Sequence, residues 1–148
     1  MASVVPKRVC GIGRVGLILA SLAGCGDGQP KPVTVTGKVV YKSTGEPATL
    51  LAGGYICLQS VSDPENKPTG RINDDGTFFL GTTVGEKNLG GVTPGEFRVR
   101  VVPPQNAAGR TTRGLIEPRF VSFDKSEIRV TIGPDKKELL IEVERPKK

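Results

Sequence analysis

The stretch Gly95–Val102, with the sequence GEFRVRVV, decides the fold class of this 148-residue chain. Phe97, Val99 and Val101 alternate with two arginines, and this period of two is typical of a strand with one face in a core and the other in water. The pair Pro103-Pro104 follows directly and predicts the end of the strand, because proline has no N–H to donate to a ladder. We therefore expect a half-buried strand with a sharply defined end.

Short segments with a similar alternation lie on both sides of this strand. They are Val33–Tyr41, Gly54–Ser60, Thr69–Ile72, Thr77–Gly81, Glu127–Ile132 and a last row made by Leu139, Ile141 and Val143. No long helical period occurs after residue 32, and the prolines fall outside the strand interiors. Short strands separated by turns in this number predict an all-β protein, a single seven-stranded Greek-key β-sandwich over residues 33–146.

Two punctuating features refine this fold. Gly37 interrupts the first segment and indicates a bulge or a close approach of another backbone. Asn73-Asp74-Asp75-Gly76 predicts a hairpin turn built on Asp-Gly, which would place Phe78 and Leu80 in the core. The same cluster could be taken for a calcium loop, but it lacks the spaced oxygens and the closing glutamate of an EF-hand loop. We therefore predict a turn here and no metal site.

Four other segments lack a clear period. Ala48–Gly53 is ambiguous, and Arg119–Phe123 predicts only a short extra segment. Thr82–Pro94 and Gln105–Pro118 predict long loops, the first rich in glycine and the second bearing arginines. Loops of this length are usually functional or mobile, so we expect a binding site, where there is one, to lie on them.

The first 32 residues have a different character. A basic start precedes the uncharged run Val15–Ala23, which has the length of the apolar part of a secretory signal and is too short to span a bilayer. We expect residues 1–24 to be a signal peptide. The polar residues 26–32 are rich in glycine and proline and predict a tether between the membrane and the sandwich.

The signal ends in Leu22-Ala23-Gly24-Cys25, which resembles the lipobox of bacterial lipoproteins. The resemblance implies cleavage between Gly24 and Cys25 and transfer of a diacylglyceryl group to the Cys25 sulfur, whose thiolate form is a good nucleophile. Two or more acyl chains, such as palmitate, hold a protein on a membrane stably, whereas one chain binds marginally. A chance cysteine in an ordinary signal peptide is the alternative.

The composition excludes several classes of function. The chain contains no histidine, which removes Ser-His-Asp and Cys-His catalysis and most zinc sites. After the signal, 18 basic and 15 acidic residues leave a net charge of +3, and the chain has two tyrosines and no tryptophan, so we expect no nucleic-acid binding. Cys57 is then the single unmodified thiol, and its apolar surroundings in the sequence predict a buried side chain. We expect no cofactor.

Three short motifs occur in order, namely Val35-Thr36-Gly37-Lys38-Val39, Asp74-Asp75-Gly76-Thr77-Phe78 and Pro94-Gly95-Glu96-Phe97-Arg98-Val99. With the closing pair of strands, this series resembles the carboxypeptidase regulatory-like domain, a transthyretin-like sandwich. The version behind a lipobox is similar to small lipoproteins of planctomycete-type bacteria. Ile116–Phe120 stands in place of their Ile-Pro-x-x-Tyr-like segment, with an inserted Glu and with Phe for Tyr.

The resemblance implies a module without catalysis. In carboxypeptidases such a domain is an appendage, and in other surface proteins it is a spacer or a sugar- or protein-binding module. The hydroxyisourate hydrolases have a similar sandwich, but they rely on histidines and a C-terminal Tyr-Arg-Gly-Ser, and this chain has neither.

We therefore expect a non-catalytic, lipid-anchored envelope protein whose sandwich faces the periplasm or the cell exterior as a binding or structural module. Arg110, Arg113 and Arg119 form the candidate ligand loop, which could meet an acidic polymer or a phosphate. A loop that is simply solvated is the simpler interpretation of these arginines. The expected partners are the membrane, through the lipid, and an envelope protein or polysaccharide.

Two alternatives stay open. The chain could be a subunit of an envelope assembly that pairs through a strand edge, in which case charged or proline-guarded edges would count against it. It could also be a carboxylate-based hydrolase, which needs two carboxyl groups with separated pKa values in one pocket. The carboxylates available for that role are Asp74, Asp75, Glu117 and Asp124.

Overall fold

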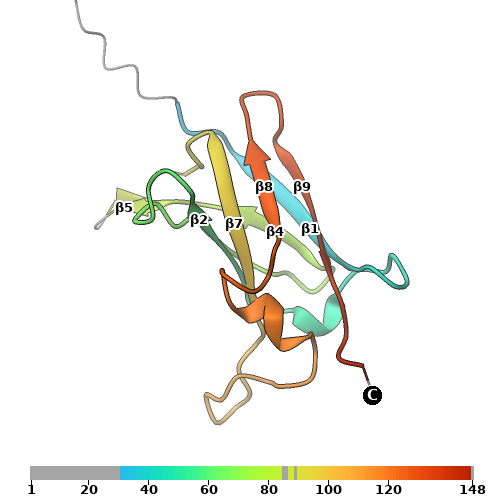
Figure 1. Ribbon diagram of the computed structural model, residues 1–148. Coiled ribbons are helices and arrows are strands. Elements are labelled where there is room, and N and C mark those ends of the chain that lie inside the picture. The colour runs from blue at the N-terminus through green and yellow to red at the C-terminus, as the bar shows by residue number, and fades with distance from the viewer. Residues whose placement is uncertain (1–30, 85–86, 89, 148) are drawn as a thin grey trace, which may run out of the picture.

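The chain folds into two β-sheets packed face to face, as a computed structural model shows for residues 31–84, 87–88 and 90–147 (Figure 1). One sheet has three strands in the order β4-β1-β9, and the other has four in the order β3-β2-β7-β8. The predicted seven-stranded β-sandwich is confirmed. The strands are β1 (Val35–Tyr41), β2 (Tyr55–Ser60), β3 (Thr69–Arg71), β4 (Thr77–Leu80), β7 (Gly95–Val102), β8 (Arg129–Ile132) and β9 (Glu138–Val143).

Shorter elements occupy the connections. β5 (Thr83–Val84) and β6 (Lys87–Asn88) form a separate two-residue ladder inside the segment that the sequence predicted as a glycine-rich loop. The ambiguous segment before β2 contains the 3₁₀ turn η1 (Thr49–Leu51). The short extra segment expected after residue 118 is the 3₁₀ turn η2 (Pro118–Val121), which has proline in its first turn, where no N–H is needed.

The strand connections follow a Greek key. β2, β3 and β4 succeed one another, and β7 returns to pair with β2, so the spatial order is β7-β2-β3-β4. The hairpin turn predicted at residues 73–76 is present, with the Asn73 N–H bonded to the Thr77 carbonyl at 2.8 Å. Its two arms belong to different sheets and are joined by the bridges Thr69–Gly81 and Ile72–Phe78. This hairpin therefore forms a closed corner of the sandwich.

The core contains the side chains that the alternation placed inside. Val35, Val39 and Tyr41 of β1 are buried, as are the inward rows of β4, β7 and β9. Two further core residues, Ile116 and Phe120, come from the segment without a period. Ile128 and Val130 of the β8 region are half-buried and pack against this core.

The prediction for Cys57 is wrong. Its side chain is half-buried on the outer face of β2, whereas Ile56 and Leu58 occupy the core. Cys57 pairs in register with Arg100 of β7 and Thr69 of β3, which also lie on the outer face. The run of apolar residues concealed the alternation, because cysteine stands at a position that faces away from the core.

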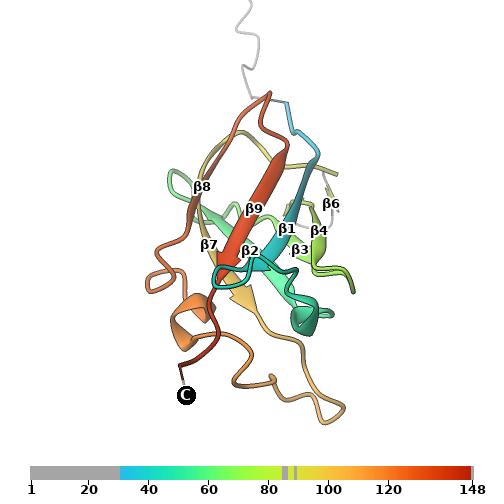
Figure 2. The same ribbon diagram turned by 90° about the vertical axis from the view of Figure 1, so that its right-hand side faces the viewer.

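The two ends of the sandwich carry different parts of the chain. The start of the described chain and the β8–β9 turn lie at one end of the sandwich. The segment between β7 and β8, which includes η2, lies at the other end (Figures 1 and 2). β1 and β9 run parallel, from Thr36 opposite Glu138 to Tyr41 opposite Val143, so both lead away from the first end. In the described ranges, no helix combines the length and the hydropathy that crossing a bilayer requires.

Gly37 is expected to tolerate no side chain. A Cβ at this position would lie 2.3 Å from the Phe78 ring and 2.7 Å from the Leu139 carbonyl oxygen. Gly37→Ala should lower the free energy of unfolding by about 1–3 kcal/mol, because overpacking displaces both neighbours. Gly133→Ala is the matched control, since nothing lies within 4 Å of its Cβ, and it should change stability by less than about 0.5 kcal/mol. Equal urea midpoints for the two variants would contradict this account of Gly37.

Candidate functional site

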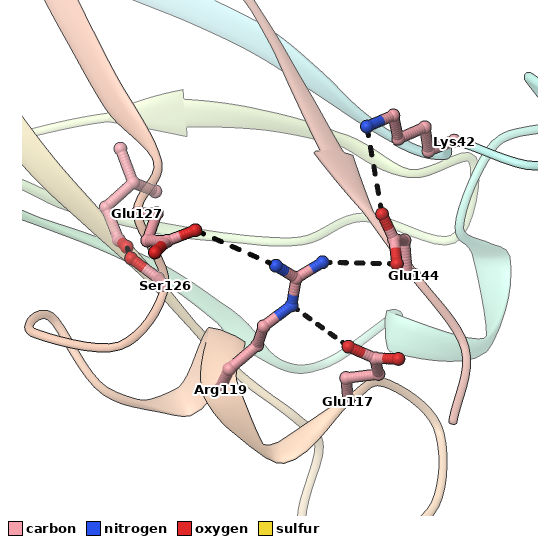
Figure 3. Close-up of polar contacts among 7 residues, drawn as sticks. Lys42, Glu117, Arg119, Ser126, Glu127 and Glu144 are labelled. Atoms are coloured by element: carbon pink, nitrogen blue, oxygen red, sulfur yellow. Dashed lines mark hydrogen bonds and ion pairs between the residues drawn. The ribbon is translucent and has the colours of Figure 1, made fainter. Parts of the chain in front are cut away.

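The structure separates the three arginines of the predicted ligand loop. Arg119 stands on η2 and is surrounded by carboxylates (Figure 3). Its Nε lies 2.9 Å from Glu117, its Nη2 lies 3.1 Å from Glu144, and its Nη1 lies 3.9 Å from Glu127. Arg119 is therefore neutralised by its own chain.

This ion-pair cluster fastens η2 to the end of β9. The Glu117 N–H donates to the Glu144 carbonyl at 2.9 Å, and Lys42 approaches the same Glu144 carboxylate at 3.8 Å. The Arg119 guanidinium also stacks over the buried Phe120 ring, 4.6 Å from its centre. Arg119 therefore has a structural role, because its N–H donors face carboxylates of the same chain.

Arg110 and Arg113 lie together in a different hollow. They line it with Asn106 and Thr111, and both side chains are exposed. The loop around them is ordered by its own hydrogen bonds. The Asn106 Oδ1 accepts from the N–H groups of Ala108 and Arg110, both at 3.0 Å, and Thr112 N–H donates to the Pro104 carbonyl at 2.9 Å.

An apolar hollow of about 500 Å³ adjoins the arginines. It shares Thr111 and Arg113 with the first hollow. The rest of its lining is Pro103, Thr112, Gly114, Leu115, Ile116, Pro118 and Val121. The sequence alone does not indicate this hollow, because residues 111–121 have no period. The available signal was the apolar pair at 115–116 inside a polar loop.

The carboxylates considered for hydrolysis lie apart in the described structure. Asp74 and Asp75 sit on the exposed β3–β4 turn, Glu117 pairs with Arg119, and Asp124 pairs with Arg98 at 3.0 Å. Of the four hollows compared, one is lined by Asp124 and the other three by none of these four residues. Among the described residues, no group of three or more cysteine, aspartate or glutamate side chains is placed to hold a metal ion.

Asp75 closes the β3–β4 turn that was weighed against a calcium loop. Its Oδ1 accepts hydrogen bonds from the Thr77 hydroxyl at 2.6 Å and from the Thr77 N–H at 3.0 Å. The hydroxyl bond, and then the backbone bond, lower the pKa of the Asp75 carboxyl below its ordinary value of 3.8. One of its oxygens is thus already engaged by the turn.

The residues of the predicted lipidation and cleavage site, Gly24 and Cys25, lie outside the described residues.

Thr77→Val should raise the pKa of Asp75 part of the way toward 3.8, because the hydroxyl bond is lost and the backbone bond stays. A carboxyl whose pKa is lowered by folding stabilises the fold above its unfolded pKa, and this stability is lost as the pH falls through the folded pKa. Carboxyl-resolved NMR titration of both proteins measures the shift. The same Asp75 pKa in the wild type and in Thr77→Val would refute the assignment. Asp75→Asn removes the titrating carboxyl, so the stability of this variant should fall less steeply with pH below pH 3.8.

The two kinds of arginine should respond differently to truncation. Arg119→Ala should lower the free energy of unfolding by about 1 kcal/mol, because it breaks half-exposed ion pairs and uncovers Phe120. Arg113→Ala removes the same side chain from the neighbouring exposed loop and should change stability by less than about 0.5 kcal/mol. Thermal and urea unfolding compare the pair. A larger loss from Arg113→Ala than from Arg119→Ala would reverse the assignment.

No protein-family model matches the chain, and no curated protein matches its sequence. Among solved structures, two of the major pilin subunit of Bacillus cereus align with 12% and 13% identity and TM-scores of 0.47 and 0.48. They cover 80% and 79% of this chain, which spans 31% of the pilin chain. A DUF3823 family protein from Bacteroides uniformis aligns with 20% identity and a TM-score of 0.42, over 77% of this chain and 43% of that one.

Proposed function

We propose that this chain is a non-catalytic, lipid-anchored β-sandwich module of a bacterial envelope, facing the periplasm or the cell exterior. The observation that carries the proposal is the lipobox-like Leu22-Ala23-Gly24-Cys25, which a short polar tether joins to a sandwich. The described chain starts at one end of the sandwich, and the exposed loop between β7 and β8 lies at the other (Figure 1). An anchored chain of this shape presents that loop away from the membrane.

The side-chain chemistry supports binding or spacing over catalysis. The chain lacks histidine, and Cys57 lies on the outer face of β2 opposite an arginine and a threonine. Arg100 is turned to the Phe123 ring, 4.8 Å from its centre. The carboxylates considered for acid and base roles stand in separate places, as described above, and general acid–base chemistry needs two of them together. A module that binds with its distal loop requires none of these arrangements.

One feature favours assembly through a strand edge as a second candidate. β8 pairs only with β7 and β9 only with β1 in the described ladders, and a hollow of about 470 Å³ lies between these two edge strands. Apolar Ile128, Val130 and Leu140 line it, which suits a partner strand. Charged side chains from both strands also line it, and such charges guard an edge against pairing. Binding through the exposed loop between β7 and β8 is therefore the first candidate function, and assembly through a strand edge is the second.

Cys25→Ser should release the protein from the membrane of a bacterial host and abolish its labelling by an alkyne analogue of palmitate, because the thiol that accepts the lipid is gone. Cys10→Ser is the matched control, since Cys10 lies in the predicted signal and should leave both readouts unchanged. Mass spectrometry of the wild type should find a mature chain that begins at lipid-modified Cys25. A Cys25→Ser protein that stays labelled and membrane-bound would overturn the anchor.

A further inference from the structure

The loop between β7 and η2 has an unbalanced charge. Residues 103–116 contain Arg110 and Arg113 and no acidic residue. Within the described structure neither guanidinium has an ion-pair partner, whereas Arg98, Arg119 and Arg129 each have a carboxylate within 3.3 Å. The two free guanidinium groups are therefore available to a ligand that brings its own carboxylates.

The backbone of this loop is ordered by its own hydrogen bonds on both sides of Arg110. Gln105 and Thr111 form a bridge, and Asn106 N–H donates to the Arg110 carbonyl at 2.8 Å, so the tip closes as a small hairpin. The turn inside it carries Gly109 at a φ of 72°, a conformation that glycine adopts without strain. A preformed loop loses less conformational entropy on binding than a mobile one.

The adjoining apolar hollow adds a second requirement. Its lining is aliphatic or small, from Pro103, Leu115, Ile116 and Val121 among others, and Val121 is 37% exposed. It contains no aromatic side chain, so it offers a sugar ring no flat face for stacking. Aliphatic walls beside a few polar groups suit an apolar side chain of an extended peptide. The hollow and the arginines are continuous through Thr111 and Arg113, which line both.

We propose that this distal surface, the apolar hollow together with Arg110 and Arg113, docks an acidic peptide segment of a partner protein. Aliphatic side chains of the segment enter the hollow, and flanking carboxylates pair with the two guanidinium groups. This inference deepens the proposed function, because it names the partner class for the end of the sandwich that faces away from the membrane. The docking itself does not require the lipid.

The test measures binding of the fluorescent peptide Glu-Glu-Leu-Pro-Leu-Glu-Glu to the full-length chain in mild detergent by fluorescence anisotropy. Two matched peptides replace the glutamates by glutamine or the leucines by serine, and both should bind more weakly. The double variant Arg110→Gln/Arg113→Gln should weaken binding of the acidic peptide by about tenfold, because two partly exposed ion pairs are lost. Val121→Asp should abolish binding, because it places a carboxylate in the hollow.

The control double variant is Lys136→Gln/Lys137→Gln, which removes the same charge from the exposed β8–β9 turn at the opposite end of the sandwich. It should bind the peptide like the wild type. Thermal unfolding checks that each variant is folded. The proposal is overturned if the acidic peptide does not bind, if both arginine and lysine variants weaken binding equally, or if polygalacturonate binds this surface in its place. Self-association that Val121→Asp abolishes would also overturn it, since the occupant would be a second copy.

Failure of the anchor and failure of the docking can be told apart. The Cys25→Ser chain, purified in the same detergent, should bind the acidic peptide with unchanged affinity, because Cys25 is not among the residues that line the distal surface. Loss of peptide binding with normal lipidation rejects the docking and leaves the anchor standing. Normal peptide binding without lipidation rejects the anchor alone.

Discussion

The sandwich depends on the absence of a side chain at Gly37. This residue sits in the central strand of the three-stranded sheet and is opposite Phe78 of β4 on one side and Leu139 of β9 on the other. The fully buried Phe78 ring occupies the space in which a Cβ would stand. Phe78 also bridges to Ile72, so the ring lies where the β3–β4 corner joins the two sheets. Because Gly37 has a hydrogen atom where other residues have a Cβ, the Phe78 ring can pack against β1 in the core.

Alternation predicted the parts of the fold that depend on a single strand. Phe97, Val99 and Val101 were assigned to the core because their period of two needs no knowledge of the partner strands. Cys57 was misplaced because an apolar run hides which of its residues face inward. The corner was also out of reach, because a hairpin turn at Asn73–Gly76 does not reveal that its arms belong to different sheets.

At the candidate site, too, the local sequence does not predict which side chains the fold brings together. Arg113 and Arg119 are of the same residue type, six positions apart in one loop, yet one is free and the other is enclosed. Their difference arises from three carboxylates around Arg119. Glu117 stands two residues before it, and the fold brings Glu144 and Glu127 to η2 from later in the chain. The sequence shows the neighbouring Glu117, but only the tertiary structure reveals the further carboxylates that make Arg119 a structural arginine and leave the other two available.

The distance between the two ends of the sandwich determines which molecules the distal surface can contact. The eight residues of β7 span about 25 Å at the usual rise of a strand, so the loop that follows stands about that far from the tether end. The tether, residues 26–32, can add at most about 3.3–3.6 Å per residue. In the anchored arrangement proposed above, a surface held at this distance by the sheet would lie beyond the lipid headgroups. In that arrangement Arg110 and Arg113 would face the envelope space, where the proposed acidic segment could reach them. Among the described residues, no carboxylate forms an ion pair with either arginine.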